Sequence, residues 1–347
     1  MWRLLIGAVV LSYAALPAAS QSLPSKKEAA VLLQKAAEAT NLRASDTPAF
    51  HLVAHVHHDS AGYRADGAYE LLWASPDRYR EDFRVQAGQD MIAESDVALA
   101  DRFYTARNTA VESFSLWRVR RAVRSVHWFF FEGAKAKVRR VYPATVADKM
   151  SICVDAALVF KDSRTCFDPS TLKAISLSLK TSDVQAEFSD FSDLGDKRYP
   201  RHIVLKEFGD AVEVKVDVLD RVAEFDPNVF VPSRECITRD WCSKPIAKGT
   251  WPDPWTSQRL TTMYSPSLVA YYLLVGQDGR VKKSAPMQAA MKDADLRVES
   301  WLATVRYPVE LCNGQPIEYE IVIQPLPHHP VASGTVQIIG ASPPRPF

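Results

Sequence analysis

The first clear pattern in the chain is an apolar stripe behind a polar start. Ser25 and Glu28 stand three residues apart, which is the capping-box arrangement in which each side chain binds a free backbone N–H of the other. Small or apolar residues then recur at helical spacing to about residue 41, namely Ala29, Leu32, Leu33, Ala36 and Thr40. The pattern predicts a helix that packs one face on another element.

From residue 49 to residue 219 the pattern changes to alternation with a period of two, which is typical of strands with one buried face. The clearest segments are 50–56, 68–73, 174–179, 203–206 and 212–218. Turn residues separate these segments, for example at 59–62, 75–77 and 209–210. We therefore expect an α+β fold, mainly an antiparallel β-sheet with the first helix packed on it.

A second helix is expected at about residues 110–125, where Val111, Phe114, Arg118 and Ala122 share one helical face. The stretch 117–140 holds eight basic residues and one acid, with an aromatic run at 128–131. One interpretation is a buried aromatic strand with solvated charges beside it. The other is a basic patch for anionic lipid headgroups, for which the candidates are Arg118, Arg121, Arg124, Lys135 and Lys137.

A proline-rich composition marks residues 236–267 as a linker, so the preceding domain is expected to cover residues 25–235. A smaller domain at 268–326 then follows the order strand, turn, strand, helix and strand, with Trp301 in the apolar stripe of the helix. The remainder, 327–347, is rich in proline and is expected to be a flexible tail apart from 336–339.

The first twenty residues have the pattern of a cleaved signal peptide: Arg3, an apolar run of sixteen residues, and small residues before residue 21. The alternative, an uncleaved membrane anchor, is disfavoured because about 20 apolar residues are needed to span a bilayer. Across its 347 residues the chain has 42 basic and 41 acidic side chains, for a formal net charge of +1. This balance disfavours a nucleic-acid partner.

Five cysteines suit an exported protein with some disulfides. Cys153 and Cys166 flank a predicted hairpin and could pair across it, and Cys236 and Cys242 could close a short loop. Cys312 would then be free, although a bond between Cys236 and Cys312 stays open as an alternative.

Candidate chemistry is sparse. His51, His55 and His57 would share one face of a strand, with His58 on the other, but no Glu or Cys stands beside them at metal-ligand spacing. The common motifs for a nucleophile, a metalloprotease or a nucleotide are missing from the sequence. We therefore expect neither an enzyme nor a cofactor; a metal-dependent hydrolase that uses the histidines is the weaker alternative.

Several segments resemble the periplasmic lipoprotein-carrier (LolA-like) family. These are the first helix, the run 67–80, and the segments 166–172, 199–203 and 225–230. The resemblance implies an unclosed antiparallel β-barrel with helices over its apolar concave face, and a lipid or lipoprotein client. Four strand aromatics are the candidates for lining that cavity, namely Tyr69, Trp73, Phe83 and Phe103.

Residues 268–326 resemble the C-terminal domain of TonB-type energy transducers, a small α/β module. The resemblance rests on 275–281, the helix with Trp301, 306–309 and the turn at 313–317. It implies docking of another envelope protein by strand addition to an exposed edge. The chain has no long Pro-Lys spacer for transmitting force, so static docking is expected.

The two resemblances, together with the signal-peptide pattern, imply a non-catalytic periplasmic protein that binds a hydrophobic ligand, docks an envelope partner and can contact the membrane peripherally. The alternative is a purely structural interaction protein whose barrel is filled by its own side chains.

Overall fold

The computed structural model describes the part of the chain that forms its helices and strands. The described residues are 22–60, 63–87, 89–100, 102–109, 113–133, 137–157, 162–180, 184–207, 210–234, 237–240, 246–248, 271–286, 300–312, 314–323 and 338–339. The predicted signal peptide lies outside them. Among the described residues, no helix has both the length and the apolar character needed to cross a membrane.

One antiparallel sheet of thirteen strands dominates the molecule, in the order β13-β5-β4-β3-β2-β1-β12-β11-β10-β9-β8-β7-β6. It does not close, because β13 and β6 lie at opposite ends. The strands are β1 Phe50–Ser60, β2 Tyr63–Ser75, β3 Arg78–Ala87, β4 Asp90–Leu99, β5 Arg102–Arg107, β6 Lys137–Val146, β7 Lys149–Ala157, β8 Asp162–Phe167, β9 Ala174–Lys180, β10 Val184–Leu194, β11 Lys197–Glu207, β12 Asp210–Arg221 and β13 Ile237–Asp240.

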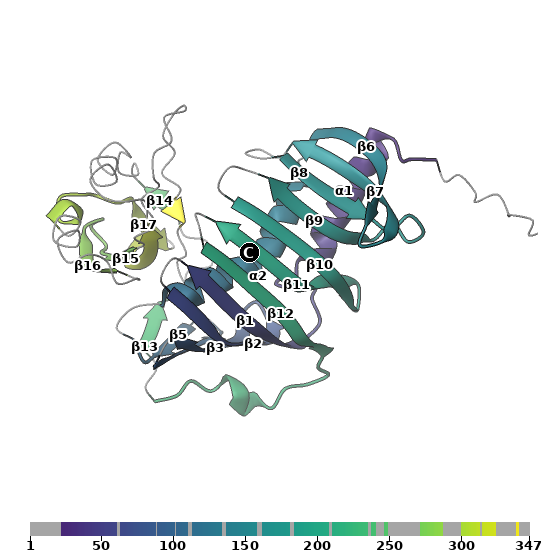
Figure 1. The fold of residues 1–347 in the computed structure, drawn as a ribbon. Coiled ribbons are helices and arrows are strands. Elements are labelled where there is room, and N and C mark those ends of the chain that lie inside the picture. Colours follow the sequence, from purple (N-terminus) through teal and green to yellow (C-terminus); the bar gives the residue numbers. More distant parts are fainter. Residues whose placement is uncertain are drawn as a thin grey trace, which may run out of the picture.

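Two helices, α1 (Lys26–Thr40) and α2 (Phe114–Gly133), lie against one side of this sheet, which curves around them (Figure 1). We call the sheet and the two helices the half-barrel. The capping box predicted for α1 is present: Ser25 Oγ accepts from the N–H of Glu28, and the Glu28 carboxylate accepts from the N–H of Ser25. The prediction of a strand at 128–131 is wrong, because that backbone continues α2.

The predicted disulfide between Cys153 and Cys166 is confirmed. These residues are direct cross-strand partners on β7 and β8, and their Cα atoms lie 4.0 Å apart. The prediction that Cys312 is free is wrong, since this cysteine is itself disulfide-bonded. Its partner lies outside the described residues, as do Cys236 and Cys242 of the predicted loop disulfide.

The chain after the half-barrel forms two small sheets, in the orders β14-β17-β18 and β16-β15-β19-β20. Their strands are β14 Ile246–Lys248, β15 Tyr271–Val275, β16 Val281–Pro286, β17 Val309–Cys312, β18 Gln315–Ile317, β19 Tyr319–Ile323 and β20 Ile338–Ile339. We call these strands, with residues 300–308, the C-terminal module. Of the predicted linker, β13 extends the large sheet beside β5, and β14 pairs with β17.

Both turns predicted for the module contain a glycine with a positive φ. Gly314 has a φ of +83°, and the flanking residues Cys312 and Gln315 pair directly across the turn. Gly279 has a φ of +75°, and a Cβ atom there would lie 2.3 Å from the carbonyl oxygen of Tyr307. A side chain at Gly279 is therefore excluded by the backbone conformation and by the lack of space beside Tyr307.

Candidate functional site

The concave face of the half-barrel is covered by the apolar faces of both helices. From α1 the covering side chains are Ala29, Leu33, Ala36 and Ala37, and from α2 they are Leu116, Val119, Ala122, Val123 and Val126. They pack against inward-facing strand residues such as Leu52, Val56, Leu205, Val212 and Val214. All of these side chains are buried. The helices thus hide an apolar curved surface that an unclosed sheet would otherwise expose to water.

The four aromatics expected to line a cavity lie inside this packing. Tyr69, Trp73, Phe83 and Phe103 are each at most 1% exposed. The Trp73 ring stacks on that of Tyr79, with 5.4 Å between their centroids. Their role in ligand binding stays a prediction, because in this structure they contact the chain's own side chains.

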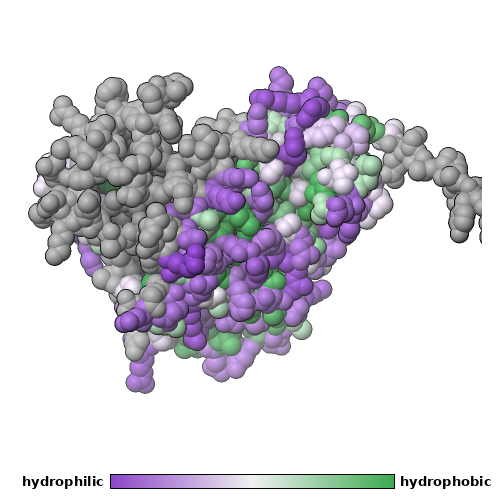
Figure 2. Space-filling view, viewed as in Figure 1, coloured by the Kyte–Doolittle hydropathy of each residue, from purple (hydrophilic) through white to green (hydrophobic). Residues whose placement is uncertain are grey.

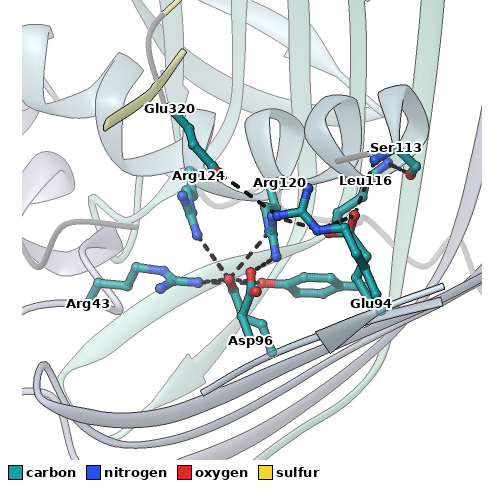
Figure 3. A network of polar contacts seen from close by, with 11 residues as sticks. Arg43, Glu94, Asp96, Ser113, Leu116, Arg120, Arg124 and Glu320 are labelled. Atoms are coloured by element: carbon teal, nitrogen blue, oxygen red, sulfur yellow. Dashed lines mark hydrogen bonds and ion pairs between the residues drawn. The ribbon is translucent and has the colours of Figure 1, made fainter. Parts of the chain in front are cut away.

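A buried carboxylate, Glu81 on β3, lies at the centre of a cluster of arginines from α2 and the end of α1. Figure 3 labels these arginines, Arg43, Arg120 and Arg124. Arg124 Nη2 lies 2.9 Å from Glu81 Oε2, and Arg120 Nε lies 3.6 Å from the same oxygen. Arg43, just after α1, donates to Glu81 Oε1, as does the Tyr69 hydroxyl. The cluster therefore joins α2 and the end of α1 to strands β2 and β3.

Charge keeps this carboxylate ionised despite its burial. Burial by itself would raise the pKa of Glu81, but the guanidinium groups of Arg124, Arg43 and Arg120 outweigh it and hold that pKa below its usual range. Burial, followed by the negative charge of Glu81, raises the pKa of Tyr69, so its phenol keeps the proton that it donates. The site contains a permanent anion held by permanent cations.

The same cluster continues toward the C-terminal module through β4 and β5. Arg120 pairs with Asp96, and its Nη1 lies 3.8 Å from Glu94 Oε2. Arg107 then bridges two carboxylates, with Nε 3.7 Å from Glu94 Oε1 and Nη2 3.8 Å from Glu320 Oε2 on β19. Figure 3 shows Glu320 reaching this cluster from the module. An unbroken series of charged contacts thus links Glu320 to Glu81.

The start of α2 is fixed beside this series. Ser113 directly precedes the helix, and its hydroxyl accepts from the N–H of Leu116 at 3.0 Å, as an N-cap residue does. The backbone N–H of Ser113 donates to Glu94 Oε1 at 3.2 Å. The start of α2 is therefore tied to β4 by a hydrogen bond, and the next turn of the helix is tied to β4 by Arg120.

A second polar contact holds α2 to β1 and β12. Arg118 Nε lies 3.5 Å from Asp210 Oδ2, and both side chains are fully buried. His58 Nδ1 lies 2.9 Å from Ser115 Oγ. Burial, then the positive charges of Arg118 and His57, lowers the pKa of His58 to about 3, so this imidazole is neutral in the folded protein at neutral pH.

The structure separates the residues proposed for a basic surface patch. Arg118 and Arg124 are used in ion pairs inside the half-barrel, Arg121 is half-buried with its guanidinium 5.9 Å from the Trp117 ring, and Lys137 is exposed on β6. Lys135 lies outside the described residues. The first two are therefore not part of an exposed patch, and headgroup binding by Arg121 and Lys137 stays a prediction.

His51, His55 and His57 project from one face of β1, while His58 projects from the other face and is buried, as the strand period predicts. Within the part of the chain that the structure describes, no three His, Cys, Asp or Glu side chains converge to hold a metal ion. The described residues therefore provide no metal site for the alternative of a metal-dependent hydrolase.

Sequence reasoning missed the Glu81 cluster, although a signal for it was present. Tyr79, Phe83 and Val85 mark the inward face of β3, and Glu81 has the same parity. An acid at an inward strand position requires a partner, because an unpaired buried charge costs several kcal/mol, on the order of 3–5 when a partner is removed. The identity of the partners could not be read from the strand itself.

No protein-family model matches the sequence, and no curated protein matches it. Solved structures with some likeness include a LolA superfamily protein from Nitrosomonas europaea, at 8% identity over 58% of this chain and 96% of that chain, with a TM-score of 0.35. A DUF1329 family protein from Desulfovibrio piger is 8% identical over 59% of this chain and 97% of that chain, with a TM-score of 0.38. A chain of the MucA/MucB complex from Pseudomonas aeruginosa is 11% identical over 85% of this chain and 80% of that chain, with a TM-score of 0.28. With TM-scores below 0.5, these likenesses assign neither a family nor an activity to this chain.

Proposed function

We propose that this protein is a non-catalytic protein of the periplasm that binds an apolar ligand, the acyl chain of a lipid or lipoprotein, on the concave face of its half-barrel. The observation that carries the proposal is the cover itself. Two helices bury apolar residues against an unclosed curved sheet, and α2 is attached there through arginine–carboxylate contacts.

Such a cover can be displaced more readily than an entirely apolar one. When an apolar contact opens, the whole free energy of burial is lost, at about 25 cal/mol per Å². When α2 moves, Arg118, Arg120 and Arg124 regain hydration that burial had removed, which offsets part of that loss. An acyl chain that packs where the apolar face of α2 had lain would restore the remaining part of the free energy of burial.

The cysteines support the proposed compartment. The Cys153–Cys166 disulfide joins two buried residues of a hairpin and suits an oxidising environment. With the signal-peptide pattern of residues 1–20, this supports export to the periplasm.

The C-terminal module is proposed to dock a second envelope protein by strand addition. In its four-stranded sheet, β16 occupies an end position beside β15. A strand in that position offers backbone N–H and C=O groups to an extended peptide. Because Glu320 lies on β19 of the same sheet, docking there would act close to the charged contacts that reach α2.

The test combines ligand detection with motion of the cover. Protein purified from its own envelope is examined by native mass spectrometry, and delipidated protein is titrated with a fluorescent fatty acid while hydrogen–deuterium exchange is followed. We expect a co-purifying lipid, a shift of the probe, and faster or slower exchange confined to α1 and α2. No bound lipid together with no probe shift would overturn the proposal.

A second candidate is a structural interaction protein with a self-filled barrel. It is favoured by one observation, the near-complete burial of Tyr69, Trp73, Phe83 and Phe103 by the chain's own side chains. In that case the fatty-acid probe leaves exchange in α2 unchanged, so the same experiment separates the two functions.

A further inference from the structure

Three inward-facing carboxylates lie close together on β3 and β4. Glu81 and Asp96 are direct cross-strand partners, and Glu94 lies two residues before Asp96 on the same face of β4. Each of the three side chains is at most 4% exposed. The opposite side of the sheet faces solvent, and Figure 2 shows hydrophilic residues over much of it. We call Glu81, Asp96 and Glu94 the acid row.

The acid row attracts α2 through Arg120. Like charges that face each other across a sheet repel, so the acid row needs a cation between its members. Arg120 pairs with Asp96, and its Nε lies 3.6 Å from Glu81 Oε2. Its Nη1 lies 3.8 Å from Glu94 Oε2 (Figure 3). One side chain of the helix thus contacts all three acids and holds α2 on this part of the sheet.

Glu94 has a second contact with α2 and a competing partner at the same atom. Its Oε1 accepts from the N–H of Ser113, the residue that caps the helix, at 3.2 Å. Arg107 is the cross-strand partner of Glu94 on β5, and its Nε lies 3.7 Å from that same oxygen. A carboxylate that is closely paired with one cation attracts other donors less, because its charge is already neutralised. A closer approach of Arg107 would therefore weaken the contacts of Glu94 with α2.

The C-terminal module attracts Arg107 from the other side. Arg107 Nη2 lies 3.8 Å from Glu320 Oε2 on β19, so its guanidinium is shared almost equally between Glu94 and Glu320. The Tyr272 hydroxyl donates to Glu320, and the Arg107 guanidinium lies 5.9 Å from the Tyr272 ring. These side chains are nearly buried, so solvent and salt screen their charges little. Tyr272 and Glu320 belong to one sheet and would leave Arg107 together if the module moved.

We propose that the C-terminal module keeps the cover of the half-barrel closed by holding Arg107 away from Glu94. While Glu320 attracts Arg107, Glu94 keeps its contacts with Ser113 and Arg120. When the module moves away, Arg107 is left with Glu94 and approaches it, which weakens the attraction of Glu94 for α2. The start of α2 then loosens. A partner that docks on the module and draws it from β5 would thereby open the cover.

This inference adds regulation to the concave face. The loosening of α2 is a property of the protein without ligand and depends only on Glu94, Arg107 and Glu320. Its consequence for an acyl chain, faster entry and release beneath α2, rests on the proposed function. The two parts can therefore fail separately.

The test is hydrogen–deuterium exchange of the full chain without ligand, followed at residues 113–117. Glu320→Gln should speed exchange there about three- to tenfold, the effect of losing about one net hydrogen bond. Arg107→Gln removes the competitor for Glu94 and should leave exchange at about the wild-type rate. The double variant should also exchange at about the wild-type rate, because Glu320 acts on α2 only through Arg107. Circular dichroism and exchange in β11 check that each variant is folded.

Glu318→Gln is the matched control, since it removes an exposed carboxylate of the same module from its pair with Lys282. The proposal is overturned if residues 113–117 exchange equally in the Glu320 and Glu318 variants. It is also overturned if the double variant exchanges as fast as Glu320→Gln alone, which would show a general loosening of the junction. Release of a fluorescent fatty acid should be faster in Glu320→Gln alone. The expected exchange pattern without any fatty-acid binding would support the closing role of the module and overturn only the proposed ligand.

Discussion

Arg107 on β5 reaches Glu320 on β19, with 3.8 Å between Nη2 and Oε2. Both side chains are nearly buried, and the Arg107 guanidinium also lies 5.9 Å from the ring of Tyr272 in the same module. Tyr272 in turn donates a hydrogen bond to Glu320. The C-terminal module is thus joined to the half-barrel at the end of the charged series that leads to α2.

Glu320→Gln removes the charge that Arg107 meets in the module. We expect the free energy of unfolding to fall by about 1–3 kcal/mol, because a buried cation loses a partner. Hydrogen–deuterium exchange should also increase in β5 and β19. The matched control is Glu318→Gln, whose pair with Lys282 is exposed and should be worth less than about 1 kcal/mol. Equal losses in the two variants would contradict a role for Glu320 in joining the module.

Glu81→Gln should be among the most destabilising single changes of charge in the half-barrel. It leaves Arg43, Arg120 and Arg124 buried around a neutral amide, so we expect a loss of about 3–5 kcal/mol in chemical unfolding. Glu70→Gln is the control, since Glu70 is 42% exposed beside His51 and its loss should cost less than about 1 kcal/mol. A Glu81 variant as stable as the Glu70 variant would show that the arginines are satisfied without it.

His58 predicts a loss of stability in acid. Its pKa is about 3 in the folded protein against an ordinary value of 6.5, so below pH 6.5 the unfolded chain binds the extra proton. Stability therefore falls as the pH drops from 6.5 toward 3, at up to about 1.4 kcal/mol per pH unit from this group. Urea unfolding at several pH values should show a shallower slope for His58→Gln. Identical slopes for wild type and His58→Gln would remove His58 as the cause.

The Cys153–Cys166 disulfide closes a short hairpin between buried strands. Replacing both residues by alanine should lower the free energy of unfolding by about 3 kcal/mol, because the unfolded chain gains freedom and the core loses contacts. Any further loss that the variant suffers on reduction reports the disulfide of Cys312. A variant as stable as wild type would mean that the hairpin is held by its strand pairing alone.

Short-range pattern was enough to predict most of the elements. The Ser25–Glu28 capping box fixes the start of α1 because its hydrogen bonds join residues three apart. Cys153 and Cys166 could be paired because a hairpin brings its two strands into register locally. The error at 128–131 has a local cause as well: an aromatic run fits a strand or a buried helix, and the sequence around it did not decide between them.

The sequence by itself determined which strand positions face inward, including the unusual inward parity of Glu81 and the outward parity of His51, His55 and His57. Only the tertiary structure decided which charges meet. Arg43, Arg107, Glu320 and the α2 pair Arg120 and Arg124 come from four separate stretches of the chain, and His202 joins the β1 histidines through strands β11 and β12. Alternation records whether a side chain points in or out, whereas ion pairing depends on distances across the sheet, and these are set by strand order and by the placement of α2.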